Sequence, residues 1–494
     1  MTDSNKTEET LDPENWEEMK VLAHRMVDDM LDHIKNSKTS TNKFPTKEER
    51  QNLMVPLSKL GEGDEKVYEA IIENALPSMV CTKTARFWGF VAGVGSPYGM
   101  LTSMLSGAFN LPSDQNMSVA FDVNRIALNW VKEMLDYPKE GSGIFVTGGS
   151  EANFTGLAVA RTAMAEIDMK HNGMQGVPRK MTLYVSEEGH HCLERSIELL
   201  GFGGENLRWI PTDDDYRIRI DALKEAINSD RDVGYHPFCV IGNAGTVNTG
   251  AFDDFNALAN LVKREKMWLH VDGSFGAWVK ISKTHRHLAD GLERADSLAV
   301  DLHKWMSMPY GIGCTLTRHP LEHLKTFVYG EEASYFKSNL DKPMDELLST
   351  SMFMGLRLSN EFLSLKPYML LRANGSEKYG RVIQRNIDQI SYLADQIGKQ
   401  PDMEVCAPVA SNIVCFRYNP GGLDEKQLEK LNHSILRALW DVSFPVVSDT
   451  SIKGKYVLRA CNVNHRSRRE DFDWLVTEVR RLGEKLLPDS KKSK

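Results

Sequence analysis

The sequence predicts an α/β protein whose main domain contains a largely parallel sheet. Between residues 86 and 365, short apolar segments alternate with stretches of helical periodicity. This alternation is typical of a parallel sheet that is covered by helices on both faces. The expected strands are residues 143–147, 182–186, 238–243, 268–272, 297–301 and 313–318.

The segments on either side of this region show different patterns. Apolar residues recur at helical spacing over residues 12–34, where Asp12 can cap a helix that begins at Pro13. Residues 1–85 are therefore expected to form a helical arm that needs a partner surface, because it has little core of its own. Residues 86–365 form the expected large domain and residues 366–494 a small α/β domain. In the small domain we expect helices at 377–399, 424–439 and 470–486 and strands at 412–418 and 456–460.

Composition excludes several classes of protein. The 494 residues carry a net charge of −8, which argues against nucleic acid as the main partner. No apolar stretch approaches the ~20 residues that a membrane span needs, and the polar, acidic start lacks the features of a signal peptide. We therefore expect a cytoplasmic protein without a membrane partner. The seven cysteines are scattered and form no C-x-x-C pair, which predicts reduced thiols.

A glycine-rich segment follows the strand 143–147 and precedes a helical stretch. Its residues Gly148, Gly149 and Ser150 can form a phosphate-binding loop, because glycines let backbone N–H groups approach an anion at a helix N-terminus. A glycine turn with a serine cap is the commoner explanation of such a segment when it is considered alone. It is not a P-loop, since no Gly-Lys-Ser/Thr follows.

Two adjacent histidines, His190 and His191, follow the strand 182–186. One of them must lie at the junction of strand and helix, where a flat ring could cover a planar ligand. A structural or capping role is the alternative. Adjacent positions on a helix point in different directions, so a joint metal site is not expected. The sequence predicts no metal site elsewhere.

Two charged residues follow the next predicted strands. Asp272 ends a strand of buried character, so its carboxylate needs a positive partner such as a protonated pyridine nitrogen, or else it caps the following turn. Lys304 lies between His303 and Trp305, just after the strand 297–301. A partly desolvated lysine is expected to have a lowered pKa and to act as a nucleophilic amine. A surface lysine fits this apolar, aromatic setting poorly.

These four features together match the four contacts that pyridoxal 5′-phosphate (PLP) requires. The cofactor needs groups for its phosphate, its ring face, its pyridine nitrogen and its aldehyde. The glycine loop, a histidine, Asp272 and Lys304 supply one each. The residues therefore predict a PLP site at the C-terminal edge of the sheet.

The sequence resembles the group II PLP-dependent amino acid decarboxylases, which include the aromatic amino acid and glutamate decarboxylases. The resemblance runs from about residue 12 to 480, and its most specific stretches are HVDGSFG around Asp272 and ERADSLAVDLHKW, which ends at Trp305. It implies fold type I (aspartate aminotransferase-like), a homodimer with shared active sites, and decarboxylation of an L-amino acid to an amine and CO2.

The resemblance also implies roles for single residues. Lys304 matches the lysine that forms a Schiff base with PLP, Asp272 the partner of the pyridine nitrogen, and His190 the histidine that stacks on the ring. Tyr335 matches a tyrosine that protonates the product carbon. The remaining cofactor contacts that it implies are Gly148, Gly149, Ser150, Thr246, Asp301 and His303.

Alternatives stay open for both the substrate and the reaction type. Aromatic residues in the segment 86–90 slightly favour an aromatic substrate, although such residues more often pack in a core. The segment 359–361 carries Ser-Asn-Glu where many members of the family carry arginines, which leaves the substrate contact open. The alternative functions are other PLP chemistry on the same fold (decarboxylation-coupled aldehyde formation, transamination or carbon–carbon lyase activity) and an inactive PLP-binding protein.

Overall fold

The structure is a computed structural model, and its chain falls into two compact units. Unit 1 comprises Met1–Thr84 with Val442–Phe444, and unit 2 comprises Ala85–Asp441 with Pro445–Lys494. The predicted boundaries at residues 85 and 365 stay predictions. The residues that the structure describes are 10–37, 44–57, 59–79, 82–111, 118–328, 351–443 and 446–487.

Unit 1 contains the helices α1 (Trp16–Asn36), α2 (Lys47–Leu53) and α3 (Asp64–Asn74). The prediction that Asp12 caps the first helix is wrong. Asn15 is the cap, because its side chain accepts hydrogen bonds from the backbone N–H groups of Glu17 and Glu18. Both glutamates also lie in the first turn, where negative charge is favourable.

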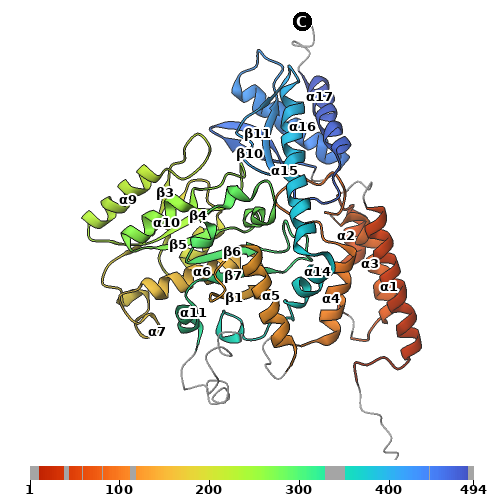
Figure 1. Cartoon of the computed structure of the whole chain (residues 1–494). Coiled ribbons are helices and arrows are strands. Elements are labelled where there is room, and N and C mark those ends of the chain that lie inside the picture. Colours follow the sequence, from red (N-terminus) through yellow and green to blue (C-terminus); the bar gives the residue numbers. More distant parts are fainter. Residues whose placement is uncertain are drawn as a thin grey trace, which may run out of the picture. The chain divides into compact units, whose positions relative to one another are not determined.

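Unit 2 contains a seven-stranded sheet in the order β1-β7-β6-β5-β4-β2-β3 (Figure 1). Only β7 runs antiparallel to its neighbours, so the prediction of a mainly parallel sheet is confirmed. The short strand β3 was not predicted. The strands are β1 (Ser142–Val146), β2 (Met181–Ser186), β3 (Leu207–Ile210), β4 (His236–Asn243), β5 (Trp268–Asp272), β6 (Ser297–Asp301) and β7 (Gly313–Thr317).

Apolar side chains on both faces of this sheet are buried under helices. One core combines residues of α5, α9 and α10, and another combines residues of α6 and α8. Because both faces are covered, five of the seven strands consist of buried residues only. The helices are α4 (Pro97–Phe109), α5 (Ala120–Met134), α6 (Gly149–Met164), α8 (Cys192–Leu199), α9 (Ile220–Asp232), α10 (Phe255–Glu265), α11 (Pro320–Phe327) and α14 (Leu365–Asn374).

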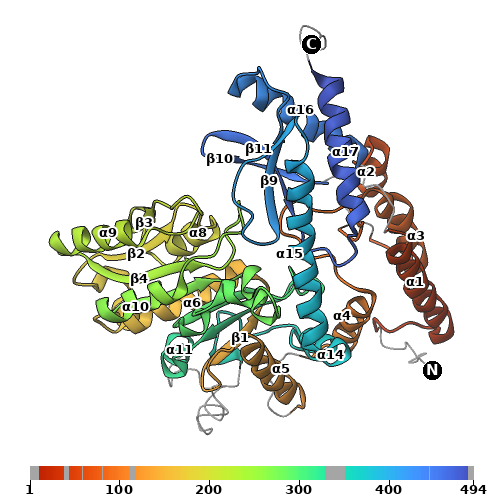
Figure 2. The same cartoon turned by 45° about the horizontal axis from the view of Figure 1, so that its top comes forward.

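A four-stranded antiparallel sheet in the order β10-β11-β9-β8 packs with the helices of the C-terminal part (Figure 2). Its strands β8 and β10 were not predicted, whereas the predicted helices and the other two strands are present. No helix in the described ranges is long and apolar enough to cross a membrane. The elements are α15 (Ser376–Gly398), β8 (Met403–Val405), β9 (Ile413–Tyr418), α16 (Glu425–Val442), β10 (Ser448–Ile452), β11 (Lys455–Cys461) and α17 (Arg469–Leu486).

Candidate active site

The segments that follow strands β1, β2, β4, β5 and β6 line one cavity of about 410 Å³. Parallel strands place their C-terminal ends at the same edge of a sheet, which explains why segments far apart in sequence meet here. The small C-terminal sheet contributes part of the wall. Of the predicted site residues, the cavity is lined by Gly149, Ser150, His190, Asp272 and Lys304.

The glycine loop leads directly into the N-terminus of α6. Gly148 is the N-cap and Gly149 the first residue of this 16-residue helix, so the first N–H groups of the helix have no partner within it. A Cβ atom on Gly149 would lie 2.5 Å from Ser274 Oγ and 2.7 Å from Asp301 Oδ2. Glycine is therefore required at this position, and the helix end can receive a phosphate next to the hydroxyl of Ser150.

His190 lines the cavity, and His191 does not. The Nδ1 atom of His190 accepts a hydrogen bond of 3.1 Å from the backbone N–H of Cys192, which places the ring proton on Nε2. Burial lowers the pKa of His190, and the positive charge of Lys304 acts in the same direction. The imidazole is therefore held in one orientation as a neutral ring, which suits stacking on a planar ligand.

Asp272 lies at the end of β5 and its carboxylate reaches the cavity although the residue is only 8% exposed. Oδ1 accepts hydrogen bonds from the backbone N–H and the hydroxyl of Ser274, at 3.1 and 2.6 Å. Oδ2 has no hydrogen-bond partner among the described residues. A buried carboxylate with one unpaired oxygen fits a protonated ring nitrogen as its partner.

Lys304 follows β6 and forms an ion pair with Asp301, with 2.8 Å between Nζ and Oδ2. Burial lowers the pKa of Lys304, but the carboxylate of Asp301 outweighs burial, so the net shift is upward. The expectation of a lowered lysine pKa is therefore wrong. The physical reason is that the buried carboxylate of Asp301 lies 2.8 Å from Nζ and stabilises the protonated amine through its charge and a hydrogen bond.

Three other predicted residues lie differently. The ring of His303 stacks on Tyr310 at 4.7 Å and its Nδ1 donates to the carbonyl of Ile312, so it supports the lysine segment from outside the cavity lining. The hydroxyl of Thr246 bonds within its own loop, to Thr249 and Ala251, and Thr246 does not line the cavity. Their cofactor contacts stay predictions. Tyr335 lies outside the described residues.

The small C-terminal sheet supplies lining residues that the sequence did not indicate. Arg459 of β11 is 4% exposed and donates hydrogen bonds to the carbonyls of Asn248 and Phe90. Thr450 of β10 donates to the side chain of Asn248 at 2.7 Å. These contacts join the small sheet to a loop of the large one, so no local pattern could have revealed them. Further lining residues that sequence reasoning missed are Cys192, Asn243, Ser274, Phe275, Ser448 and Asp449.

The aromatic residues of the segment 86–90 lie partly in the core and partly at the cavity wall. Phe87 and Trp88 are buried, and Trp88 stacks on Phe472 at 4.6 Å, so these rings are core residues. Phe90 lines the cavity and is 52% exposed. Its φ of +57° is unusual for a residue with a side chain. The segment 359–361 lines a different cavity.

The residues present fit PLP. The cavity combines a helix N-terminus for a phosphate, a neutral imidazole for a ring face, a buried carboxylate with an unpaired oxygen and a lysine amine. Each group would meet a different part of the cofactor.

The conserved domain of pyridoxal-dependent decarboxylases matches residues 47–419. The chain belongs to the pyridoxal-dependent decarboxylase family. It is 32% identical over 475 residues to the aromatic-L-amino-acid decarboxylase of Bacillus atrophaeus, and the match covers 95% of this chain and 96% of that protein. It is 26% identical to the phenylacetaldehyde synthase of Arabidopsis thaliana, with 92% and 94% covered.

Solved structures show the same fold for this decarboxylase. Oryza sativa TDC with PLP and tryptamine superposes with a TM-score of 0.88 at 22% identity, covering 97% of this chain and 100% of that one. Mouse CSAD gives a TM-score of 0.84 at 22% identity, with 94% and 99% covered. The fold is therefore PLP fold type I, and the protein is a PLP-dependent amino acid decarboxylase, as the sequence predicted.

Proposed function

We propose that this decarboxylase converts an aromatic L-amino acid to its amine and CO2, with Lys304 as the residue that holds PLP covalently. The observation that carries the assignment of the site is the meeting of four strand ends at one cavity, which brings Lys304, Asp272, His190 and the N-terminus of α6 together. The aromatic substrate is supported by the decarboxylase of Bacillus atrophaeus at 32% identity and by Phe90 at the cavity wall.

Each side chain has one task in the proposed mechanism. PLP supplies an electron sink for the electron pair that CO2 leaves behind. Asp272 keeps a proton on the ring nitrogen, because Ser274 fixes its carboxylate and burial makes the unpaired charge costly. His190 fixes the tilt of the ring, and the amides at the start of α6 bind the phosphate.

Proton transfer at Lys304 involves Asp301. The amine must lose a proton before Nζ can form a covalent bond, and the carboxylate of Asp301, with Oδ2 2.8 Å from Nζ, is the adjacent base that would accept this proton. Tyr335 or a water molecule returns the proton to the substrate carbon in this proposal.

Replacement of Lys304 tests the covalent attachment. Lys304→Ala should abolish turnover and the visible absorbance of the bound cofactor, because no other amine in the described part of the chain lines the cavity. Borohydride reduction followed by peptide mapping should label Lys304 in the native chain. Lys325→Ala is the control, since Lys325 is exposed and pairs with Glu322. Full activity of Lys304→Ala, or a label at another lysine, contradicts the assignment.

Aldehyde formation is the second candidate function, because the phenylacetaldehyde synthase is 26% identical over nearly the whole chain. The two reactions differ in the organic product that accompanies CO2. Incubation with the aromatic amino acids, followed by separate measurement of amine and aldehyde, distinguishes them. Aldehyde as the main product would replace the proposal of simple decarboxylation.

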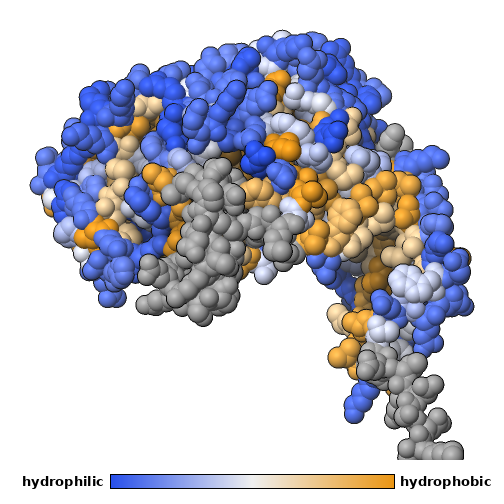
Figure 3. Space-filling model, turned by 60° about the horizontal axis from the view of Figure 1, so that its bottom comes forward, coloured by the Kyte–Doolittle hydropathy of each residue, from blue (hydrophilic) through white to orange (hydrophobic). Residues whose placement is uncertain are grey.

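We also propose a homodimer in the cytoplasm. The helical arm of unit 1 exposes large apolar side chains, among them Trp16 at 65%, Met54 at 77% and Leu57 at 101%, and Figure 3 shows apolar side chains gathered on one side of it. Such surfaces mark interaction sites. Light scattering should give twice the mass of one chain, and Met54→Glu should weaken the dimer. A native chain that stays monomeric at micromolar concentration contradicts this proposal.

A further inference from the structure

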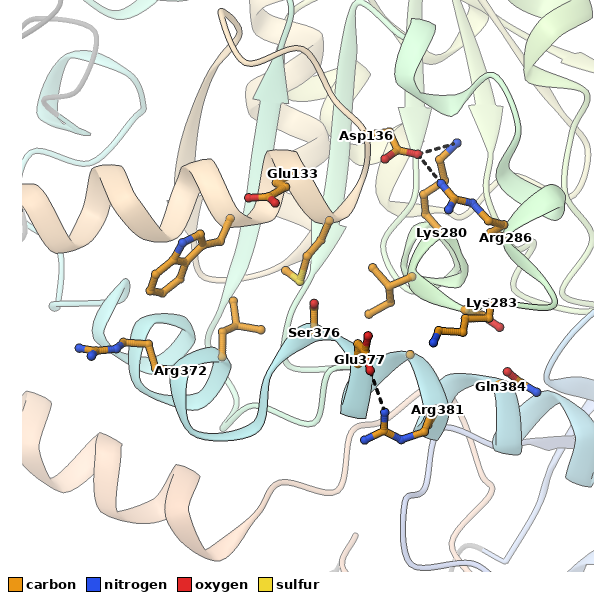
Figure 4. A pocket seen from close by; sticks show the side chains of 16 residues that line it. Glu133, Asp136, Lys280, Lys283, Arg286, Arg372, Ser376, Glu377, Arg381 and Gln384 are labelled. Carbon is orange, nitrogen blue, oxygen red and sulfur yellow. Dashed lines mark hydrogen bonds and ion pairs between the residues drawn. The ribbon is translucent and has the colours of Figure 1, made fainter.

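A second cavity, of about 470 Å³, lies between α5, α14, α15 and the 3-10 helix η4 (Gly276–Ile281) (Figure 4). It shares no lining residue with the catalytic cavity. Its apolar part consists of Trp130, Met134, Ile281 and Leu371. A Cβ atom on Gly380 would lie 2.2 Å from the carbonyl oxygen of Ile281, so glycine lets α15 approach η4 at this wall.

Most charges around the cavity neutralise one another. Asp136 forms ion pairs with Arg286 at 2.7 Å and with Lys280 at 3.5 Å. Lys280 also forms an ion pair with Glu293 at 3.0 Å. The side chain of Lys280 is only 5% exposed, whereas its partners Asp136 and Glu293 are 47% and 35% exposed, so a buried ammonium group anchors a partly exposed network at this end of the cavity. Figure 4 shows Asp136, Lys280 and Arg286 together on one side of the cavity.

The α15 side of the cavity carries its own ion pair. Glu377 pairs with Arg381 at 3.3 Å, one turn apart on the helix (Figure 4). The three carboxylates in these ion pairs are those of Asp136, Glu293 and Glu377, and none of them pairs with Lys283.

Lys283, on the segment that follows η4, lines the cavity, is exposed and has no ion-pair or hydrogen-bond partner among the described residues. Gln384 on α15 lines the same wall and likewise has no partner in the described part of the chain. The cavity therefore presents the unpaired ammonium group of Lys283 and the amide of Gln384 beside an apolar surface. Its lining also includes Glu133 and Arg372, neither of which has an ion pair among the described residues. A bound carboxylate would pair with the ammonium group, and an attached ring or alkyl chain would cover the apolar residues.

We propose that this cavity is a second ligand site that binds a small carboxylate with an apolar or aromatic body. The apolar residues favour such a body over a bare anion, and the unpaired charge of Lys283 favours it over a neutral ring compound.

Calorimetric titration of the holoenzyme with 4-phenylbutyrate tests the proposal without depending on turnover. One equivalent per chain should bind at this site. Acetate lacks the apolar body and 4-phenylbutan-1-ol lacks the charge, so both should bind at least about tenfold more weakly. Equal affinity for acetate or for the alcohol overturns the proposal.

Two charge-reversal variants locate the site. Lys283→Glu should weaken 4-phenylbutyrate binding about tenfold or more, because it replaces attraction with repulsion. Lys378→Glu changes the net charge equally on an exposed residue of α15 that does not line the cavity, and it should bind as the native chain does. Unchanged binding in Lys283→Glu, or an equal loss in both variants, overturns the proposal.

Discussion

Asp272 shows how one residue combines a structural cost with a chemical task. Its carboxylate is buried and receives two hydrogen bonds at a single oxygen, both from Ser274. A carboxylate that is oriented in this way is prepared to face a positive charge without reorganising.

We expect Asp272→Asn to lower kcat by about 10²-fold or more, because a neutral amide no longer stabilises the protonated ring nitrogen. Ser274→Ala should cost less, since the backbone N–H of residue 274 still holds the carboxylate. Steady-state kinetics of both variants, with the absorbance of the bound cofactor as a control for loading, decide the point. An unchanged kcat in Asp272→Asn would show that another group polarises the ring.

At the scale of elements, close contact between two segments fixes the position of the lysine. Gly93 packs against the backbone that follows β6, and a Cβ atom there would lie 1.8 Å from the carbonyl oxygen of His303 and 2.4 Å from that of Lys304. No side-chain rotation relieves a clash with backbone.

Gly93→Ala should therefore displace the lysine segment and reduce both cofactor retention and activity strongly. Gly107→Ala is the matched control, because nothing lies within 4 Å of a Cβ atom at that helical position, and it should stabilise α4 by roughly 0.5–1 kcal/mol. Thermal unfolding and cofactor content after dialysis are the measurements. Equal cofactor retention in both variants would contradict the packing argument.

The sequence was sufficient to predict the elements that have a strong local pattern of apolar residues. The buried strands β5 (WLHVD) and β6 (SLAVD) are mostly apolar and end in an aspartate, and the residues after them follow from chain order alone. The strand β10, with the sequence SDTSI, has four polar residues out of five and lies at a sheet edge, so it gives no such pattern. Arg459 was missed because its place at the cavity depends on how the small sheet packs on a distant loop.

At the scale of the whole molecule, buried neutral histidines link stability to pH. Burial lowers the pKa of His323 and of His465 to about 4. His323 is fully paired as a neutral ring, since it contacts the hydroxyl of Ser142 and donates to the carbonyl of Met354. In the unfolded chain both rings take up a proton near pH 6.5.

The contribution of these histidines to the free energy of unfolding is therefore fully present above pH 6.5, and it is lost as the pH falls from 6.5 toward 4. We expect His323→Gln to flatten the dependence of the unfolding free energy on pH between 5 and 6 by about 1.4 kcal/mol per pH unit, which corresponds to one proton. Urea unfolding at several pH values measures the slope. Equal slopes in variant and native chain would show that folding does not lower the pKa of His323.

Trp305 is buried next to Lys304, and its indole N–H bonds to Asn386 of α15 at 3.1 Å. If Lys304 holds PLP as proposed above, an indole held rigidly on the next residue is expected to transfer its excitation energy to the cofactor. The fluorescence of Trp305 should therefore be quenched when the cofactor is attached and recover when the cofactor leaves. This fluorescence would serve as an intrinsic spectroscopic probe of cofactor loading.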